Sequence, residues 1–293
     1  FRRVLFRSKI HIGVIMGTQL DSSLSLLDAN GDKKLCPIDM LYKHMHDIIS
    51  TAATNHGITS EELQSVYAEA VNNLFDGAKF SEVNTALKIA LRTRIELNSN
   101  YTYLVAAVLD NENRTEVCTI LGLPLDATDA DILLPSIKHG IKVGRISPKV
   151  LEKFSEEDII ELSKRMVDER SSNFTYLGLQ TLYDRYFLHD NEVRYETAQV
   201  FFMRVAIGHA FNESREDASQ QTRTQVTADR VLKVNPVDKF LDSREDFPID
   251  ESVLLDNALW FICDLYDAYS KFEYMSSTPT LFNSATIAPQ MSS

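Results

Sequence analysis

Glycine and long apolar runs are both scarce in this chain of 293 residues. Gly occurs only 10 times, well below the usual frequency of about 7%, and together with the many Leu, Ala, Glu and Lys residues this favours helices. No apolar run reaches the roughly 18 residues that a membrane-spanning helix needs. The composition therefore predicts a helical protein with no membrane partner.

Cysteine is also scarce, with Cys36, Cys118 and Cys263 far apart in the sequence. The absence of short spacings between them argues against a disulfide framework and against a zinc site, and it fits a reducing cytoplasm. We expect the three thiols to be small buried groups rather than redox residues. His44 and His46 lie two apart on a predicted helix, so their side chains point in different directions and predict no metal site.

Basic residues are fewer than acidic ones, 30 against 42, which gives a net charge of -12. This charge excludes a general affinity for nucleic acid. Residues 1–8 (FRRVLFRS) are basic in an acidic chain and begin without Met, so we interpret them as a cloning remnant. The alternative is a secretory signal, but Lys9 and His11 interrupt its apolar stretch. The whole chain has enough apolar residues, 44%, to bury a sizeable core.

Apolar residues recur at helical spacing through the first part of the chain. Thr59 and Glu62 form a capping-box signature, and an amphipathic pattern follows over residues 63–75. Two further helices are predicted over residues 81–95 and 101–109.

A polar stretch over residues 111–128 contains Pro124 and is predicted to be a linker. Helices are predicted again from residue 131, after a cap at Ser155, and over residues 176–187, 198–211 and 257–272. Residues 219–256 break this pattern, since they are rich in Gln, Thr, Asp and Arg, and we expect an inserted surface loop or a partly disordered excursion. The last segment is predicted to be extended and rich in turns.

Hydroxyl groups and prolines are concentrated in that last segment, 276–293, which reads SSTPTLFNSATIAPQMSS. It resembles the stretch with which the large, catalytic subunit of ribonucleotide reductases enters its active-site barrel, where the pattern is S-x-P-T-x-x-N-x-x-T … P-Q-x-S-S-C. Residues 264–272 resemble the family helix Y-D-x-x-S-x-F, and residues 176–187 and 196–211 resemble the helices before it. The resemblance covers about residues 131–293, apart from the insertion.

The resemblance implies a substrate-binding role for hydroxyl groups in this segment. In the family, the Thr of the Thr-Pro pair and the Ser before the Cys contact the phosphate and sugar region of the nucleotide; these positions are Thr278 and Ser293, and Ser292 offers a further donor. The final Cys of the pattern is catalytic and would come next. We therefore expect no catalytic residue in this chain, and a split gene, an intein junction or a truncation before that Cys.

The first part of the chain resembles an ATP cone, the regulatory module that precedes the barrel in many of these reductases. The second half of the ATP cone is similar to residues 74–77, 81–83 and 101–107 of this chain. In its first half, the nucleotide-gripping V-x-K-R-D-G reads LLDANG over residues 26–31, and D-K-I reads DML over 39–41. The positions at which this chain departs from the family's nucleotide-binding pattern are Asp28, Ala29, Met40, Phe80 and Asn84.

A triphosphate buried without paired cations is costly, so this resemblance implies a degenerate cone that has lost ATP and dATP binding. The alternative is that the alignment has slipped and that Lys33 and Lys34, which lie nearby, replace the missing cations.

Taken together, the sequence predicts a mainly α protein. We expect a degenerate ATP-cone domain over 9–110, the helical reductase N-terminal domain over 131–218, the inserted loop over 219–256, and over 257–293 a helix and the first strand of a ten-stranded α/β barrel. Another chain, a C-terminal fragment of the large subunit, would complete that barrel.

The function implied is that of a class I ribonucleoside-diphosphate reductase, a cytoplasmic oxidoreductase that converts ribonucleotides to deoxyribonucleotides. This chain would be inactive alone and would bind no cofactor. The complete enzyme needs a metal-bearing small subunit that generates the radical, and a dithiol reductant. One alternative is a non-catalytic helical regulator that docks on a reductase; another is a class II enzyme, which shares the tail motif.

Overall fold

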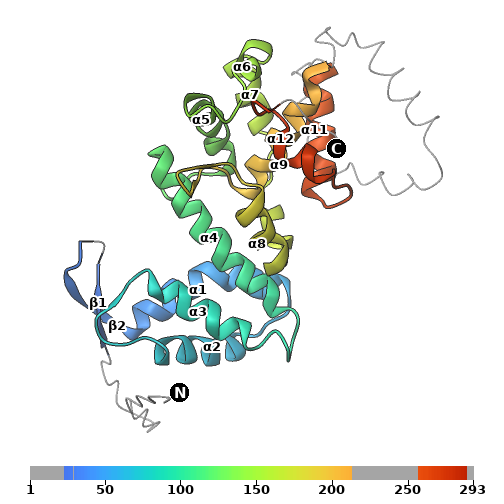
Figure 1. Cartoon of the computed structure of the whole chain (residues 1–293). Coiled ribbons are helices and arrows are strands. Elements are labelled where there is room, and N and C mark those ends of the chain that lie inside the picture. Colours follow the sequence, from blue (N-terminus) through green and yellow to red (C-terminus); the bar gives the residue numbers. More distant parts are fainter. Residues whose placement is uncertain (1–22, 29, 213–256, 289–293) are drawn as a thin grey trace, which may run out of the picture. The chain divides into compact units, whose positions relative to one another are not determined.

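The computed structural model describes residues 23–28, 30–212 and 257–288 (Figure 1). The fold is mainly helical and divides into two compact units. Unit 1 comprises residues 1–115 and 171–184, and unit 2 comprises residues 116–170 and 185–293. The predicted remnant 1–8 and the predicted insertion 219–256 lie outside the described residues. Within the described part, no helix is both long and apolar enough to cross a membrane.

Unit 1 contains a small three-stranded sheet. β1 (Ser23–Leu27) pairs antiparallel with β2 (Lys33–Pro37) and parallel with β3 (Ala78–Lys79). Leu24 and Leu26 are buried, because successive side chains of a strand point to opposite faces. On the other face Leu35, opposite Ser25, is 71% exposed. One face of the sheet thus joins the helical core.

That core is built by α1 (Ile38–Asn55), α2 (Ser60–Asn72), α3 (Glu82–Arg92) and the first turns of α4 (Tyr101–Leu121). The predicted capping box at Thr59 and Glu62 is confirmed, with both reciprocal hydrogen bonds present. The amphipathic pattern predicted over 63–75 extends beyond the helix, since its last residue, Phe75, is 62% exposed. The reason is that α2 ends at Asn72, so Phe75 falls in the turn that leads to β3.

The predicted linker over 111–128 is also wrong, because α4 continues as far as Leu121. Polar residues of this stretch are not all at the surface: Asn113 is 1% exposed and lies one turn before the buried Val117 and Cys118. The helix stops where Gly122 adopts a φ of +68°, a conformation that glycine reaches without steric cost.

Residues 171–184 belong with unit 1, although they follow most of unit 2 in the sequence. They include the greater part of α8 (Tyr176–Arg185). The backbone amide of Tyr176 donates to Thr102 Oγ1 at 3.1 Å, and the Arg92 guanidinium lies 5.5 Å from the centre of the Tyr176 ring. Each compact unit is therefore built from two separate stretches of the sequence, and the domains 9–110 and 131–218 stay predictions.

Unit 2 is assembled around α9 (Ala198–His209), in which every residue from Ala198 to Gly208 is buried. α11 (Asn257–Ser270) packs along it (Figure 1). The surrounding elements are α5 (Asp129–Lys142), α6 (Lys149–Lys153), α7 (Glu156–Ser163), the hairpin of β4 (His189–Asp190) and β5 (Val193–Arg194), and the 3₁₀ turns η1 (Asp168–Asn173) and η2 (Ala210–Asn212).

The predicted cap of α7 at Ser155 is confirmed; its side chain accepts from the amide of Asp158, which caps it in return. On α7, Ile159 and Leu162 are buried but Ile160 is 47% exposed. Ile160 follows Ile159 directly, so on a helix it faces a different direction.

The last described element is α12 (Thr278–Asn283). The prediction of an extended chain is wrong over these six residues. Pro279 lies in the first turn of α12, where its fixed φ suits a helix and its missing N–H is not needed. Thr280 and Leu281 on the helix are buried. The end of the predicted first barrel strand, residues 289–293, lies outside the described residues.

Candidate functional site in the C-terminal segment

Thr278 is the first residue of α12 and is exposed. Its Oγ1 lies 3.1 Å from the phenolic oxygen of Tyr186, which follows α8. The other two predicted substrate contacts, Ser292 and Ser293, lie outside the described residues. Among the described residues of unit 2, Thr278 is therefore the one predicted substrate contact.

Tyr186 was not identified from the sequence. Its ring lies 6.4 Å from that of Phe201 on α9 and 5.4 Å from that of Phe282 on α12, measured between ring centres. The aromatic residues of the pattern YLGLQTLYDRYF predict a buried helix face, but nothing in that pattern indicates which hydroxyl meets Thr278.

The backbone after α12 is fixed by local hydrogen bonds. Ser284 donates twice to the carbonyl of Thr280, through its amide at 3.0 Å and its Oγ at 2.7 Å. Thr286 donates in the same way to the carbonyl of Asn283, at 3.0 and 2.8 Å. Between them Ala285 adopts a φ of +62°, a strained conformation for a residue with a Cβ. Strain of this kind persists only where the surroundings enforce it.

The surroundings include the loop after α5. The Ser147 amide donates to the Ala285 carbonyl at 2.9 Å, and the Ile287 amide donates to the Arg145 carbonyl at 3.1 Å. These bonds flank an antiparallel bridge between Ile146 and Thr286. The loop after α5 and the chain after α12, which are far apart in the sequence, are thus held together by backbone hydrogen bonds. We call this contact the clamp.

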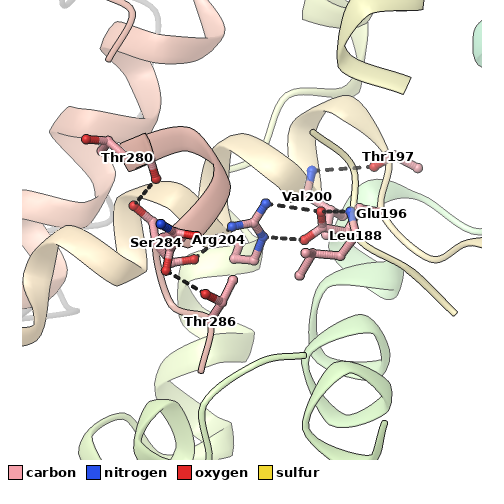
Figure 2. A network of polar contacts seen from close by, with 9 residues as sticks. Leu188, Glu196, Thr197, Val200, Arg204, Thr280, Ser284 and Thr286 are labelled. Atoms are coloured by element: carbon pink, nitrogen blue, oxygen red, sulfur yellow. Dashed lines mark hydrogen bonds and ion pairs between the residues drawn. The ribbon is translucent and has the colours of Figure 1, made fainter. Parts of the chain in front are cut away.

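A buried arginine completes the clamp (Figure 2). Arg204 lies in α9 and its side chain is 1% exposed. Its Nη1 donates to the Ser284 carbonyl at 2.7 Å, while its Nε and Nη2 donate to the two oxygens of Glu196 at 2.5 and 3.3 Å. Figure 2 shows the guanidinium pointing at the chain after α12 on one side and at Glu196 on the other.

Glu196 is 0% exposed and has a second donor. Its Oε2 accepts from the Leu188 amide at 2.8 Å. The next residue, Thr197, caps α9 by accepting from the Val200 amide at 3.4 Å, and it donates to Asp129 at 2.6 Å. A buried ion pair is tolerated only when its remaining polar atoms are hydrogen-bonded, and here the partners come from α9, the chain after α8 and the chain after α12.

Gly208, one turn after Arg204, explains how closely the segment approaches α9. A Cβ built on Gly208 would lie 2.3 Å from the Ala285 nitrogen and 2.7 Å from the Ser284 carbonyl carbon. The absence of a side chain at this position therefore permits the contact. Neither Gly208 nor Arg204 was expected to matter; the available signal was a charged residue inside the otherwise apolar run QVFFMRVAIGHAF.

In unit 1 the cone-like positions form a different local structure. The Oδ1 of Asp28 accepts from the amides of Asn30 and Asp32, at 2.9 and 3.0 Å, and closes the loop between β1 and β2. Its Oδ2 lies 2.6 Å from Lys34 Nζ. The hydrogen bond from Lys34, followed by those from the loop amides, lowers the pKa of the Asp28 carboxyl. Asp28 thus closes the loop as an anion; Ala29 lies outside the described residues.

The other changed positions include two that meet at one histidine. His44 on α1 lies with its ring centre 5.0 Å from that of Phe80, and its Nε2 is 3.1 Å from Asn84 Oδ1. Met40 is 61% exposed. Of the two lysines that were the alternative cations, Lys34 already pairs with Asp28.

The three cysteines form no disulfide with one another. Cys36 and Cys118 are buried, and Cys263 is partly buried. Burial raises the pKa of Cys36 and raises that of Cys263 to about 12. Among the residues that the structure describes, no group of three or more His, Cys, Asp or Glu side chains is placed to hold a metal ion.

Comparison with known proteins gives a consistent family. Residues 172–287 match the model of the ribonucleotide reductase all-alpha domain. The chain is 31% identical over 228 residues to the ribonucleoside-diphosphate reductase subunit alpha of Chlamydia pneumoniae, a match that covers 76% of this chain and 17% of that protein. It is 27% identical over 244 residues to the alpha subunit of Helicobacter pylori, covering 79% and 25%.

A viral alpha subunit, that of Enterobacteria phage T4, is 26% identical over 163 residues, covering 55% of this chain and 20% of the relative. The chain thus spans about a fifth of the length of the curated relatives that it matches. The chain is thus similar over residues 172–287 to the ribonucleotide reductase all-alpha domain, and over most of its length to the N-terminal region of ribonucleoside-diphosphate reductase alpha subunits.

Proposed function

We propose that this chain acts as the N-terminal region of a class I ribonucleoside-diphosphate reductase alpha subunit, in an enzyme that reduces ribonucleoside diphosphates to deoxyribonucleotides. The observation that carries the proposal is the clamp in unit 2. Arg204, Gly208 and the loop at Ser147 hold the segment that resembles the entrance to the reductase barrel. A segment held on several sides can serve as part of a rigid binding wall.

Within that wall, Thr278 is proposed to bind the substrate. Thr278 is exposed, whereas Thr280 on the same helix is buried. A hydroxyl on a fixed backbone can donate to a phosphate or sugar oxygen with little loss of conformational freedom. Ser292 and Ser293 are proposed as further substrate contacts on the strength of the sequence resemblance.

The reducing chemistry needs thiols from elsewhere. A thiolate is the reactive form of cysteine, and desolvation raises the pKa of Cys36 and of Cys263, which disfavours the thiolate at both positions; Cys118 is buried. We therefore propose that the catalytic cysteines belong to a C-terminal region of the alpha subunit that completes the barrel. A metal-bearing small subunit would generate the radical, and a dithiol would supply the electrons.

Unit 1 is proposed to be a degenerate ATP cone that binds neither ATP nor dATP. Asp28 places a carboxylate in the loop where the family pattern has cations, and it pairs with Lys34. A polyphosphate at this loop would meet an anion and would have to compete for that lysine. The clustering of Phe80 and Asn84 around His44 is compatible with a structural role for these positions.

A non-catalytic regulator that docks on a reductase is the competing function. A regulator and the proposed function explain a degenerate cone equally well. A regulator, however, gives no role to an exposed Thr278 on a clamped segment. The two functions differ in one property: a regulator would change the rate of an already complete reductase, whereas the proposed function makes the rate depend on this chain.

Reconstitution tests the proposal. The chain is mixed with a polypeptide that carries the remaining reductase region, beginning at the catalytic Cys, together with a small subunit and a dithiol, and the reduction of a ribonucleoside diphosphate is assayed. We expect turnover only when this chain is present. The chain alone and the mixture without it serve as controls. Turnover without the chain that merely changes on its addition would favour the regulator.

A further inference from the structure

We propose that Tyr186 is a positioning residue, which orients the Thr278 hydroxyl so that it donates a hydrogen bond to the nucleotide substrate. The inference rests on the proposed function, because it assumes that Thr278 faces that substrate. Its starting point is the contact between Tyr186 Oη and Thr278 Oγ1, 3.1 Å long, between residues 92 positions apart.

The Tyr186 ring is held on two sides. Phe201, which is 0% exposed, anchors it to α9, and Phe282 on α12 packs against it from the segment that carries Thr278. Tyr186 Oη therefore keeps a fixed position relative to α12. A hydroxyl that is fixed in this way can select one rotamer of the threonine side chain it contacts.

The chemistry of the two hydroxyl groups sets the direction of the hydrogen bond. A phenol is more acidic than an aliphatic alcohol, and its oxygen lone pairs are partly delocalised into the ring, so the phenol is the better donor and the alcohol the better acceptor. Tyr186 then donates to Thr278, and the Thr278 proton remains available for another acceptor. Chains of hydrogen bonds strengthen one another, so accepting from Tyr186 makes Thr278 a better donor.

The acceptor this arrangement fits is an oxygen of the phosphate or sugar region of a nucleotide. Thr278 is exposed and lies at the first position of α12. Tyr186 does not need to touch the substrate. Its effect would therefore appear only while the Thr278 hydroxyl is present, which separates a positioning role from a general contribution to packing.

The test is a double-mutant cycle in the reconstituted reductase, with Tyr186→Phe, Thr278→Val and the double variant. Tyr186→Phe keeps the ring contacts and removes only the hydroxyl. We expect kcat/KM for the ribonucleoside diphosphate to fall about three- to tenfold in each single variant, the range for one lost hydrogen bond. Most of the fall should be a rise in KM, because the contact exists in the ground state as well as in the transition state.

The double variant decides the mechanism. We expect it to match Thr278→Val alone, because without the Thr278 hydroxyl there is nothing left for Tyr186 to orient. Thr278→Ser keeps a hydroxyl at this position and should stay within about twofold of the wild type. Tyr42→Phe removes a phenolic hydroxyl from unit 1 and should leave KM unchanged.

Three results would overturn the inference. These are an unchanged KM in Tyr186→Phe while Thr278→Val is impaired, additive losses in the double variant, or a loss in Thr278→Ser as large as that in Thr278→Val. The last comparison also applies if Tyr186→Phe fails to fold, as judged by its thermal unfolding. If the wild-type chain supports no reduction at all, the proposed function is wrong and the inference falls with it.

Discussion

The guanidinium of Arg204 donates to the carbonyl oxygen of Ser284, at a distance of 2.7 Å between Nη1 and the oxygen, across 80 positions of sequence (Figure 2). The contact joins the central helix of unit 2 to the chain after α12. Because Glu196 is buried beside the guanidinium, the contact belongs to an ion pair that loses stability when either partner is removed. The position of the candidate substrate segment and the stability of unit 2 are therefore linked.

Replacing Arg204 by Leu should leave the Glu196 carboxylate buried without a cation. We expect the free energy of unfolding of unit 2 to fall by about 3–5 kcal/mol, the range for breaking a buried pair. Chemical denaturation followed by circular dichroism measures the change. The double variant Arg204→Leu/Glu196→Leu should recover a large part of the loss, since it leaves no buried charge. Equal stability of Arg204→Leu and the wild type would contradict the role assigned to this pair.

Gly208→Ala should push the chain after α12 away from α9. The new Cβ would lie 2.3 Å from the Ala285 nitrogen, which is backbone and cannot rotate aside. We expect a loss of about 1–3 kcal/mol, as for other overpacked sites, and faster cleavage near Ala285 in limited proteolysis. The matched control is Gly178→Ala on α8, whose Cβ would meet no backbone but two side chains, Thr175 Oγ1 at 3.2 Å and Phe174 Cδ1 at 3.7 Å. That variant should be neutral or up to about 1 kcal/mol more stable. Similar behaviour of both variants would refute the close-approach argument.

The helices and their caps could be predicted because the signals are local. The boxes at Thr59 and Ser155 need only residues three positions apart, and the buried positions of α2 and α3 follow the helical period. Local rules failed where burial depends on a distant partner. Asn113 is polar yet buried, and for this reason the second half of α4 was predicted to be a linker.

The candidate site was predicted only in part for the same reason. Thr278 could be found because the tail pattern is continuous in the sequence. Arg204, Glu196 and Tyr186 act through partners about eight to ninety positions away, and hydrophobic periodicity does not indicate which charge inside an apolar helix will be neutralised. The helical conformation of α12 was missed because Thr-Pro pairs occur in turns as well as at the first positions of helices.

Cys263 should resist alkylation in the folded chain. Burial raises the pKa of its thiol to about 12, so at pH 8 only on the order of one molecule in ten thousand carries the reactive thiolate. Incubation with iodoacetamide, followed by mass spectrometry of the peptides, should show slow labelling of Cys263 and rapid labelling once guanidinium unfolds the chain. Rapid labelling of the native protein would mean that this thiol is accessible and reactive.

His209 should make the stability of unit 2 sensitive to mild acid. Burial lowers the pKa of His209 below its ordinary value of 6.5, and its Nε2 lies 3.3 Å from the hydroxyl of Tyr269. Since the unfolded chain then takes up a proton at a higher pH than the folded chain, the contribution of His209 is complete above about pH 6.5 and is lost as the pH falls through the folded pKa.

The measurement is the free energy of unfolding at pH 7.5 and 5.5, compared between the wild type and His209→Gln. Other titrating groups act in both proteins, so the difference between the two slopes isolates His209. We expect a smaller loss of stability on acidification in the variant. Identical slopes would show that the folded and unfolded states bind the His209 proton equally well.

ATP and dATP should not bind to unit 1. The loop between β1 and β2 is closed by the Asp28 carboxylate, which accepts two backbone amides and pairs with Lys34. A triphosphate would have to displace this anion or lie beside it, and either costs electrostatic free energy that no cation at Met40 or Phe80 repays. Calorimetric titration should give no binding heat with either nucleotide.

Micromolar binding that disappears in Lys33→Ala/Lys34→Ala would instead show that these lysines replace the missing cations and that the cone is functional. Binding that survives the double substitution would place a nucleotide site elsewhere in the chain. Because Lys33 and Lys34 lie in β2 and not in the core helices, the double variant should keep the thermal stability of the wild type, which separates lost binding from lost folding.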